Sequence, residues 1–349
     1  MQCLDVPRTD GGNPGILNFF HRGEARIPVR NEKKRTIMKL IIQIPCFNEE
    51  KTLPVTLADL PKSIPGVDEI EILIIDDGSS DRTREVAREQ GVHHVVGFSG
   101  NRGLARAFQL GIDSCLARGA DIIVNTDADN QYCGGDIPKL VTPILEGRAD
   151  LVIGDRETQK ISHFSPLKKF LQKQGSQVVG QMAGADVPDA TSGFRAFSRD
   201  TALELNITSD FSYTLETLIQ AGRKRLAVVN VPIGTNKVLR PSRLFRSMPQ
   251  FVKRSCGTMV RVYTTYQPLK VFLTAAVVCL MPALILFLRF FYYYLHGQGG
   301  GRVQSLIIAV AFTVCSAFLA TIGVMADMIN TNRKLIEDLL RRVRDRESF

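Results

Sequence analysis

The stretch Ile70-Glu-Ile-Leu-Ile-Ile-Asp76-Asp77-Gly-Ser-Ser-Asp81 joins a short apolar run to an acidic turn and then to a polar segment. A run of this length that ends in Gly and Ser predicts a buried strand followed by a turn. Asp81 is suited to cap the helix predicted over residues 81–90, because its side chain can accept the first free N–H groups. The stretch is one unit of a strand–helix alternation.

That alternation predicts strands over residues 39–44, 70–75, 94–97, 122–125 and 151–154, and helices over residues 49–60, 81–90, 103–118 and 136–146. Such a pattern is typical of an α/β fold with a Rossmann-like, mostly parallel sheet that is covered on both faces. Ligands of these sheets bind beyond the carboxyl ends of the strands. Three polar turns follow predicted strands there, at Asp76-Asp77, Asp127-Ala-Asp129 and Asp155-Arg156. We therefore expect a site at this edge.

Two apolar runs near the C-terminus, over residues 271–288 and 306–326, each have about the 20 residues that cross a bilayer. The short turn between them predicts a transmembrane hairpin. Basic residues lie on both outer flanks, whereas the turn contains only Arg302. This distribution predicts that the large domain and the C-terminus face the cytoplasm. Two buried helices of a soluble core are the alternative.

The chain divides into five predicted parts. They are a disordered N-terminal extension (1–37), a catalytic domain (38–239), a basic interfacial segment (240–268), the hairpin (269–327) and a cytoplasmic basic C-terminal helix (328–349). Residues 165–182 have the pattern of an amphipathic helix with a basic face, which suits lipid headgroups or an ordinary protein surface.

The pair Asp127 and Asp129 is the strongest candidate for chemistry. Two carboxylates at this spacing after a buried strand can reach one hard cation, Mg²⁺ or Mn²⁺, which can bridge the phosphates of a nucleotide diphosphate. A pair of this kind is by itself commonly a solvated turn. Asp77 is the better ligand candidate of the second acidic turn, where Asp81 is expected to cap a helix.

Five motifs follow one another along the chain. They are Ile44-Pro45-Cys46-Phe47-Asn48-Glu49-Glu50, Ile74-Ile-Asp76-Asp77-Gly-Ser-Ser-Asp81, Asn101-Arg-Gly103, Asp127-Ala-Asp129-Asn-Gln131 and Thr191-Ser-Gly-Phe-Arg195. In this order they resemble the motifs of family 2 glycosyltransferases of the GT-A fold, and more narrowly those of dolichol-phosphate mannose synthases and their bacterial polyprenyl-phosphate relatives. The resemblance covers residues 38 to about 265.

The resemblance implies a role for each matching position. The donor would contact Pro45, Phe47, Glu49, Ile75, Asp77, Asp127, Ala128, Arg156, Arg240 and Arg243. The metal would be held by Asp129, Gln131 and Asp127, and the catalytic residues would be Asp127, Asp129 and Asp189. Our candidates for the acceptor phosphate are Lys168, Lys169 and Arg195, because cations near the membrane can pair with it.

The function that this implies is an inverting, metal-dependent transfer of a sugar from a UDP- or GDP-sugar to undecaprenyl or dolichyl phosphate. The enzyme would be a multi-pass protein of the cytoplasmic membrane, and a homo-oligomer is compatible with the sequence. The chain has no tryptophan, so the QxxRW signature of processive polysaccharide synthases is absent.

Two other functions remain open at this point. The first is transfer to diacylglycerol or ceramide, whose neutral hydroxyl needs a general base; an accessible Asp189 with a raised pKa would favour it. The second is a catalytically silent scaffold that binds a nucleotide sugar. The net charge of +9 does not by itself exclude nucleic acid. The basic residues, however, lie beside the apolar runs without an aromatic platform.

Overall fold

The computed structural model describes residues 37–156, 187–207, 213–236, 263–297 and 303–347, together with Ser176, Val179, Gly180, Gly257, Val260 and Arg261. Residues 1–36 of the predicted extension lie outside this part of the chain. Most of the basic stretches 165–182 and 240–268 also lie outside it.

The described residues form one sheet of seven strands in the order β3-β2-β1-β4-β6-β5-β7. Only β6 runs antiparallel to its neighbours, so the predicted mostly parallel sheet is confirmed. The strands are β1 (Lys39–Cys46), β2 (Glu69–Asp76), β3 (His94–Gly97), β4 (Ile122–Asn125), β5 (Leu151–Asp155), β6 (Arg195–Ser198) and β7 (Val228–Pro232).

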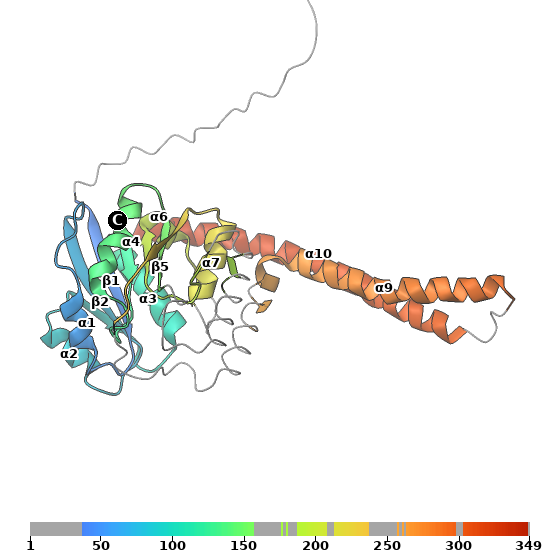
Figure 1. The fold of residues 1–349 in the computed structure, drawn as a ribbon, viewed down its shortest axis with the longest axis horizontal. Coiled ribbons are helices and arrows are strands. Elements are labelled where there is room, and N and C mark those ends of the chain that lie inside the picture. Colours follow the sequence, from blue (N-terminus) through green and yellow to red (C-terminus); the bar gives the residue numbers. More distant parts are fainter. Residues whose placement is uncertain are drawn as a thin grey trace, which may run out of the picture. The chain divides into compact units, whose positions relative to one another are not determined.

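Helices cover both faces of this sheet (Figure 1). They are α1 (Leu53–Asp59), α2 (Thr83–Glu89), α3 (Leu104–Ala117), α4 (Ile137–Leu145) after the 3-10 turn η1 (Gly134–Asp136), α6 (Arg199–Glu204) and α7 (Tyr213–Arg223). Alternate side chains of the strands enter two apolar cores, as the period of two requires. One core packs on α3, α6 and α7, and the other packs on α1, α2 and α4.

The register of the strands brings their polar ends to one edge. Gln43 of β1 lies opposite Asn125, the last residue of β4, and Cys46 lies opposite Asp76, the last residue of β2. Because β6 runs in the reverse direction, its first residue, Arg195, is paired with Asn125 at the same edge. The loops around these ends form what we call the carboxyl edge.

Helices α9 (Pro268–Leu295) and α10 (Val303–Glu347) are long and apolar enough to cross a membrane. They pack on each other through small residues, and the Ser316 hydroxyl donates to the Ala276 carbonyl at 2.8 Å. In the most apolar 18-residue stretch of each helix, protein buries only 11% of the stretch in α9 and 17% in α10. Exposed apolar faces of this kind argue against two helices of a soluble core.

Helix α10 continues without a break beyond the predicted end of the hairpin at residue 327. Its last turns contact the catalytic domain: Arg341 pairs with Glu204, and Arg344 lies 3.2 Å from the Asp113 carboxylate. Arg344 also donates to the Leu205 carbonyl at 2.8 Å. The residues on both sides of the predicted boundary at 327 therefore belong to one continuous helix, α10.

Candidate active site

Asp76 is the last residue of β2 and Asp77 follows it, and their carboxylates make different contacts. Asp76 is fully buried and pairs with the guanidinium of Arg84. Asp77 accepts the backbone N–H groups of Arg102 at 2.7 Å and Gly103 at 2.9 Å. Burial raises the pKa of Asp77, although these two hydrogen bonds oppose the rise. Asp77 thus holds the loop before α3 at the carboxyl edge, and its contact with a nucleotide base stays a prediction.

The turns after β1 and β2 are joined by hydrogen bonds. Asn48 has a φ of 55°, a left-handed conformation that Asn tolerates, and its side chain accepts the Ser80 N–H at 2.8 Å. Asp81 accepts the N–H groups of Glu50 at 3.2 Å and Thr83 at 3.0 Å. Burial opposes ionisation of Asp81, but the hydrogen bond from the Thr83 hydroxyl and these two N–H groups lower its pKa overall. The N-cap of α2 is Arg82, so Asp81 lies one residue before the predicted cap position and binds the N–H of the first helical residue, Thr83.

The residues predicted to line a base and ribose lie together at the ends of β1 and β2. Pro45 is buried opposite Ile75 in the sheet, whereas the ring of Phe47 just beyond the strand is 37% exposed. Glu49 is nearly buried, and its carboxylate accepts the Thr52 hydroxyl at 2.6 Å. An exposed aromatic ring beside backbone and carboxylate acceptors is suited to contact a flat nucleotide base.

The loop after β4 carries the aspartate pair. Asp127 and Asp129 are both partly exposed, and the Asp129 carboxylate accepts the Gln131 N–H at 3.1 Å. Ala128 is 3% exposed, and its carbonyl accepts the Thr56 hydroxyl at 3.0 Å. The buried alanine fixes the loop on α1, while the two aspartates beside it remain partly exposed.

A network of buried hydrogen bonds holds this loop in place. The Asn125 amide donates to the Gly193 carbonyl at 2.8 Å and to the Tyr213 hydroxyl at 3.0 Å. The Gly193 N–H donates to the Tyr132 hydroxyl at 2.9 Å. A Cβ atom at Gly193 would lie 2.6 Å from the Tyr213 oxygen and 3.2 Å from an Asp127 oxygen. Only glycine fits this approach between β6 and the Asp127 carboxylate.

Arg156 and Asp189 form a buried pair next to the same loop. Arg156 contacts both oxygens of the Asp189 carboxylate, at 2.7 and 2.9 Å, and the Thr191 hydroxyl at 2.8 Å. Burial opposes the charge of Asp189, but Arg156 and Thr191 lower its pKa overall. Burial also opposes the charge of Arg156, and the influence of Tyr132, Asp189 and Asp127 raises its pKa. Three predicted site residues, Asp127, Arg156 and Asp189, are thus brought together.

The sequence predicts that Arg195 contacts the acceptor phosphate, which requires an exposed side chain. The structure places Arg195 in a different environment. Its side chain is fully buried. The guanidinium donates to the carbonyls of Ser192 at 2.8 Å, Thr214 at 2.7 Å and Ala190 at 2.9 Å, and to the Thr217 hydroxyl. Burial lowers its pKa to about 10. We therefore correct the assignment: Arg195 ties β6 to α7 and presents no exposed donor to a phosphate.

The other predicted phosphate contacts, Lys168, Lys169, Arg240 and Arg243, lie outside the described residues. The sequence did not single out Asn125, Tyr132 or Tyr213, although these residues hold the aspartate loop in place. Asn125 was visible as a polar residue at the end of an apolar run. The two tyrosines carry no signal of their own, because a buried tyrosine is ordinary in a core.

Several carboxylates gather around the end of β1. Burial raises the pKa of the Cys46 thiol, and the charges of Glu49, Asp76, Asp81 and Asp127 add to this rise. The negative charge makes the carboxyl edge favourable for a cation.

The donor set at the aspartate loop fits a hard divalent cation. Asp127, Asp129 and Gln131 offer oxygen ligands, and the Asn130 amide oxygen is buried without a hydrogen-bond partner in the described structure. Within the described ranges, no three His, Cys, Asp or Glu side chains form a closed metal cluster. A cation here would therefore take its other ligands from substrate oxygens and water, as Mg²⁺ commonly does.

A parallel sheet with a polar, acidic carboxyl edge is the arrangement of enzymes that bind nucleotides. The sequence model of the family described as "Glycosyl transferase family 2" matches residues 41–205 of this chain. The chain belongs to this family and is a glycosyltransferase.

An undecaprenyl-phosphate mannosyltransferase of Micrococcus luteus is 30% identical over 206 residues, which cover 56% of this chain and 83% of the relative. A polyprenol monophosphomannose synthase of Mycolicibacterium smegmatis is 26% identical, with 57% and 78% covered. An uncharacterized protein of Methanocaldococcus jannaschii is 35% identical, with 56% and 81% covered. The names of the Micrococcus and Mycolicibacterium relatives, together with a 32% identical dolichol-phosphate mannosyltransferase of Pyrococcus furiosus, confirm the resemblance to the dolichol-phosphate mannose synthase group.

Among solved structures, glucosyl-3-phosphoglycerate synthase from Mycobacterium tuberculosis, in complex with Mn²⁺, UDP and phosphoglyceric acid, is 19% identical. The TM-score is 0.49, and the match covers 65% of this chain and 78% of that one.

Proposed function

We propose that the chain transfers a sugar from a UDP- or GDP-sugar to polyprenyl phosphate at the cytoplasmic face of a membrane, with inversion of the anomeric carbon. The observation that carries this proposal is the 30% identity to an undecaprenyl-phosphate mannosyltransferase over 83% of that relative. The two apolar helices support a lipid acceptor, because a membrane-bound enzyme meets its lipid substrate in two dimensions.

In this proposal the donor lies across the carboxyl edge. Phe47, Glu49 and Asp77 surround the base and ribose, and the diphosphate reaches the loop of Asp127 and Asp129. A divalent cation held by the loop would offset the charge of the departing diphosphate. Arg156 adds a fixed positive charge nearby, and Asp189 keeps its guanidinium in one orientation. The predicted contacts of Lys168, Lys169, Arg240 and Arg243 with phosphates also belong to this proposal.

The chemical step needs little help from a base. A phosphate monoester is ionised near neutral pH, so one of its oxygens can attack the anomeric carbon directly. The bond between that carbon and the diphosphate oxygen breaks as the new bond forms, and the diphosphate leaves with the electron pair. The protein's main tasks are to align the two phosphates and to stabilise the departing charge.

The burial of Asp189 and its lowered pKa argue against hydroxyl acceptors such as diacylglycerol or ceramide. A general base for a neutral hydroxyl has to be accessible and works best with a pKa near the operating pH. Asp189 is fully buried, and its pKa is lowered. A silent scaffold that binds a nucleotide sugar would use the same two aspartates, Asp127 and Asp129, so a transfer assay is needed to separate it from an enzyme.

The experiment incubates membranes that contain the full chain with a panel of radiolabelled UDP- and GDP-sugars and added polyprenyl phosphate. We expect an acid-labile labelled lipid, because a glycosyl phosphate hydrolyses readily in acid. Membranes carrying Asp129→Ala are the matched control. An acid-stable labelled lipid would indicate a hydroxyl acceptor instead, and an absence of labelled lipid with every sugar would contradict the proposal.

A further inference from the structure

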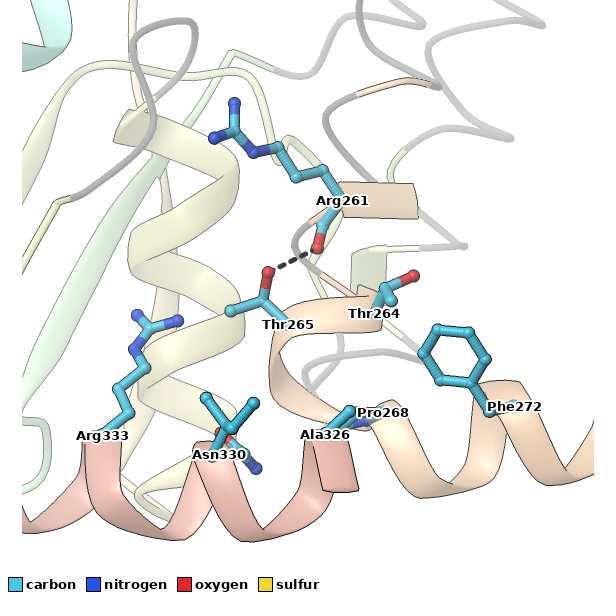
Figure 2. Close-up of a pocket in the computed structure, with 9 residues that line it drawn as sticks. Arg261, Thr264, Thr265, Pro268, Phe272, Ala326, Asn330 and Arg333 are labelled. Atoms are coloured by element: carbon cyan, nitrogen blue, oxygen red, sulfur yellow. Dashed lines mark hydrogen bonds between the residues drawn. The ribbon is translucent and has the colours of Figure 1, made fainter. Parts of the chain in front are cut away.

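A pocket of about 420 Å³ lies where α9 and α10 meet the helical segment that precedes α9 (Figure 2). Three elements contribute to it, and the residues that matter here are Arg261, Pro268, Phe272, Ala326, Ile329 and Arg333. Its walls are mainly apolar, and two of the residues that line it, Arg261 and Arg333, carry guanidinium groups on the side away from Phe272 (Figure 2). This combination suits an amphiphile that carries a negative charge.

Arg333 is held in a fixed orientation at this pocket. It donates to the Tyr266 hydroxyl at 2.8 Å and to the Glu337 carboxylate at 2.8 Å. Its guanidinium also lies over the Tyr266 ring, 4.5 Å from the centroid. The side chain nevertheless remains 22% exposed. A partly exposed arginine whose rotamer is already fixed loses little entropy when it binds an anion.

The surroundings of the pocket keep a positive charge. Arg261 is exposed, and its guanidinium has no ion pair or hydrogen bond within the described part of the chain. Arg223 contributes a third guanidinium, 5.9 Å from the centroid of the Tyr266 ring. The carboxylates that act on Tyr266 are Glu216 and Glu337. Arg333 is paired with Glu337, whereas Arg261 is exposed and keeps its positive charge, so an anion is the complementary occupant.

The position of the pocket along the two helices matches the headgroup region of a bilayer. Pro268 and Phe272 lie in the first turns of α9, just as its apolar run begins. Ala326 ends the apolar run of α10, and Arg333 follows two turns later. Cations at such boundaries lie among lipid phosphates, whereas the apolar side chains below them meet acyl chains.

The pocket is distant from the reacting atoms. Tyr213, at one end of α7, hydrogen-bonds Asn125 below the aspartate loop, and Arg223, at the other end, lies over Tyr266. None of the residues that line the pocket lies in the aspartate loop or among the residues that hydrogen-bond to it. The pocket is therefore separate from the site at Asp127.

We propose that this pocket binds the phosphodiester headgroup of an anionic bilayer phospholipid. Arg261 and Arg333 contact the phosphate oxygens, and the first acyl carbons lie along Phe272 and Ile329. The inference rests on the membrane insertion of α9 and α10, which is part of the proposed function, but it does not depend on the transfer reaction.

The test measures lipid binding to the purified full chain in a neutral detergent by native mass spectrometry, with dioctanoyl phosphatidylglycerol and dioctanoyl phosphatidylcholine as probes. We expect the anionic lipid to bind more tightly. Arg261→Gln should weaken its binding about tenfold, the usual effect of losing one charge-assisted hydrogen bond. Lys334→Gln removes the same charge from an exposed neighbour of Arg333 outside the pocket lining, and it should change binding less than about twofold.

Arg333→Gln should weaken binding as Arg261→Gln does. If Arg333→Gln misfolds because Tyr266 and Glu337 lose their partner, the binding of phosphatidylglycerol to Arg261→Gln is the deciding measurement. Equal binding of the two lipids, or equal weakening by Lys334→Gln and Arg261→Gln, would overturn the proposal. Tighter binding of a ten-carbon isoprenyl phosphate that displaces phosphatidylglycerol would reassign the pocket to the acceptor. A transfer assay on the same samples separates the two proposals, because Arg261 has no part in the reaction.

Discussion

Arg156 and Asp189 join β5 to the segment before β6 through two parallel hydrogen bonds of 2.7 and 2.9 Å. The Asp189 side chain is fully buried, and that of Arg156 is 10% exposed. Loss of either partner would leave a charge with little access to water. The pair therefore acts on both stability and the position of a positive charge near Asp127.

We expect Asp189→Asn to lower the free energy of unfolding by about 3–5 kcal/mol, because it leaves the Arg156 charge buried without a counter-ion. Transfer activity should fall as well, since Arg156 loses its fixed orientation. Thermal unfolding in detergent and a transfer assay measure the two effects. Asp200→Asn, at an exposed position in the first turn of α6, is the control and should change stability by less than about 0.5 kcal/mol. A stable, active Asp189→Asn enzyme would contradict the importance of the pair.

The pH dependence of this effect follows from the lowered pKa of Asp189. A carboxylate with a lowered folded pKa stabilises the protein above its unfolded pKa of about 3.9, and this stabilisation is lost as the pH falls through the folded pKa. We expect the difference in Tm between wild type and Asp189→Asn to stay constant from about pH 8 to pH 5, and to shrink only below about pH 4. A difference that shrinks already between about pH 7 and pH 5 would indicate a raised pKa, which suits a general base.

Asp129→Ala should reduce transfer by about a hundredfold or more, because a metal ion contributes several kcal/mol to charge stabilisation in such reactions. The fold and membrane insertion should be unaffected, since the Asp129 side chain is partly exposed. Initial rates over a titration of Mg²⁺ or Mn²⁺ are the measurement. Asp200→Ala is a matched control that removes an exposed carboxylate elsewhere. Wild-type rates in Asp129→Ala with EDTA present would rule out the proposed metal site.

Arg195→Lys should destabilise the enzyme by about 3 kcal/mol, because one ammonium cannot replace a guanidinium with four buried acceptors. The KM for polyprenyl phosphate should stay unchanged in the folded fraction. Thermal unfolding and acceptor titration measure the two effects, and the exposed Arg225→Lys is the control. A raised acceptor KM with unchanged stability would restore the phosphate role that the sequence suggested.

The proposed topology places the turn between α9 and α10 outside and the C-terminus in the cytoplasm. A cysteine introduced at Gly299 should react with a membrane-impermeant maleimide added to intact cells, whereas a cysteine at Ser348 should react only after permeabilisation. The parent chain, with its seven native cysteines, gives the background. The opposite labelling pattern would reverse the orientation.

The sheet could be predicted well where each strand was an apolar run between clear turns. Strands β3 and β4 have the predicted bounds, and β1, β2 and β5 are longer than predicted by only one or two residues. The predicted ends of the helices over residues 81–90 and 103–118 are also close to the observed ends, where Gly91 and Gly119 follow with φ values of 68° and 75°. Local sequence determines these features, so no knowledge of distant contacts was needed.

The antiparallel strand β6 and the environment of Arg195 could not be predicted in this way. Only four residues form β6, and Arg195 at its start resembles an exposed cation in a loop. Its burial depends on acceptors from α7, about 20 residues later in the chain. Similarly, the partner of Arg156 lies 33 residues away, so neither local pattern nor motif order indicates the ion pair.

Helix α10 has 45 residues, which corresponds to a length of about 68 Å, whereas the hydrocarbon core of a bilayer is about 30 Å thick. The same uninterrupted helix carries the apolar segment and, near its end, Arg341 and Arg344 on the catalytic domain. A change in its tilt, which a mismatch between helix and bilayer thickness produces, therefore also displaces the domain that it contacts. In the proposed membrane-spanning arrangement, bilayer thickness thus becomes a physical variable that sets how far Asp127 and Asp129 lie from the lipid.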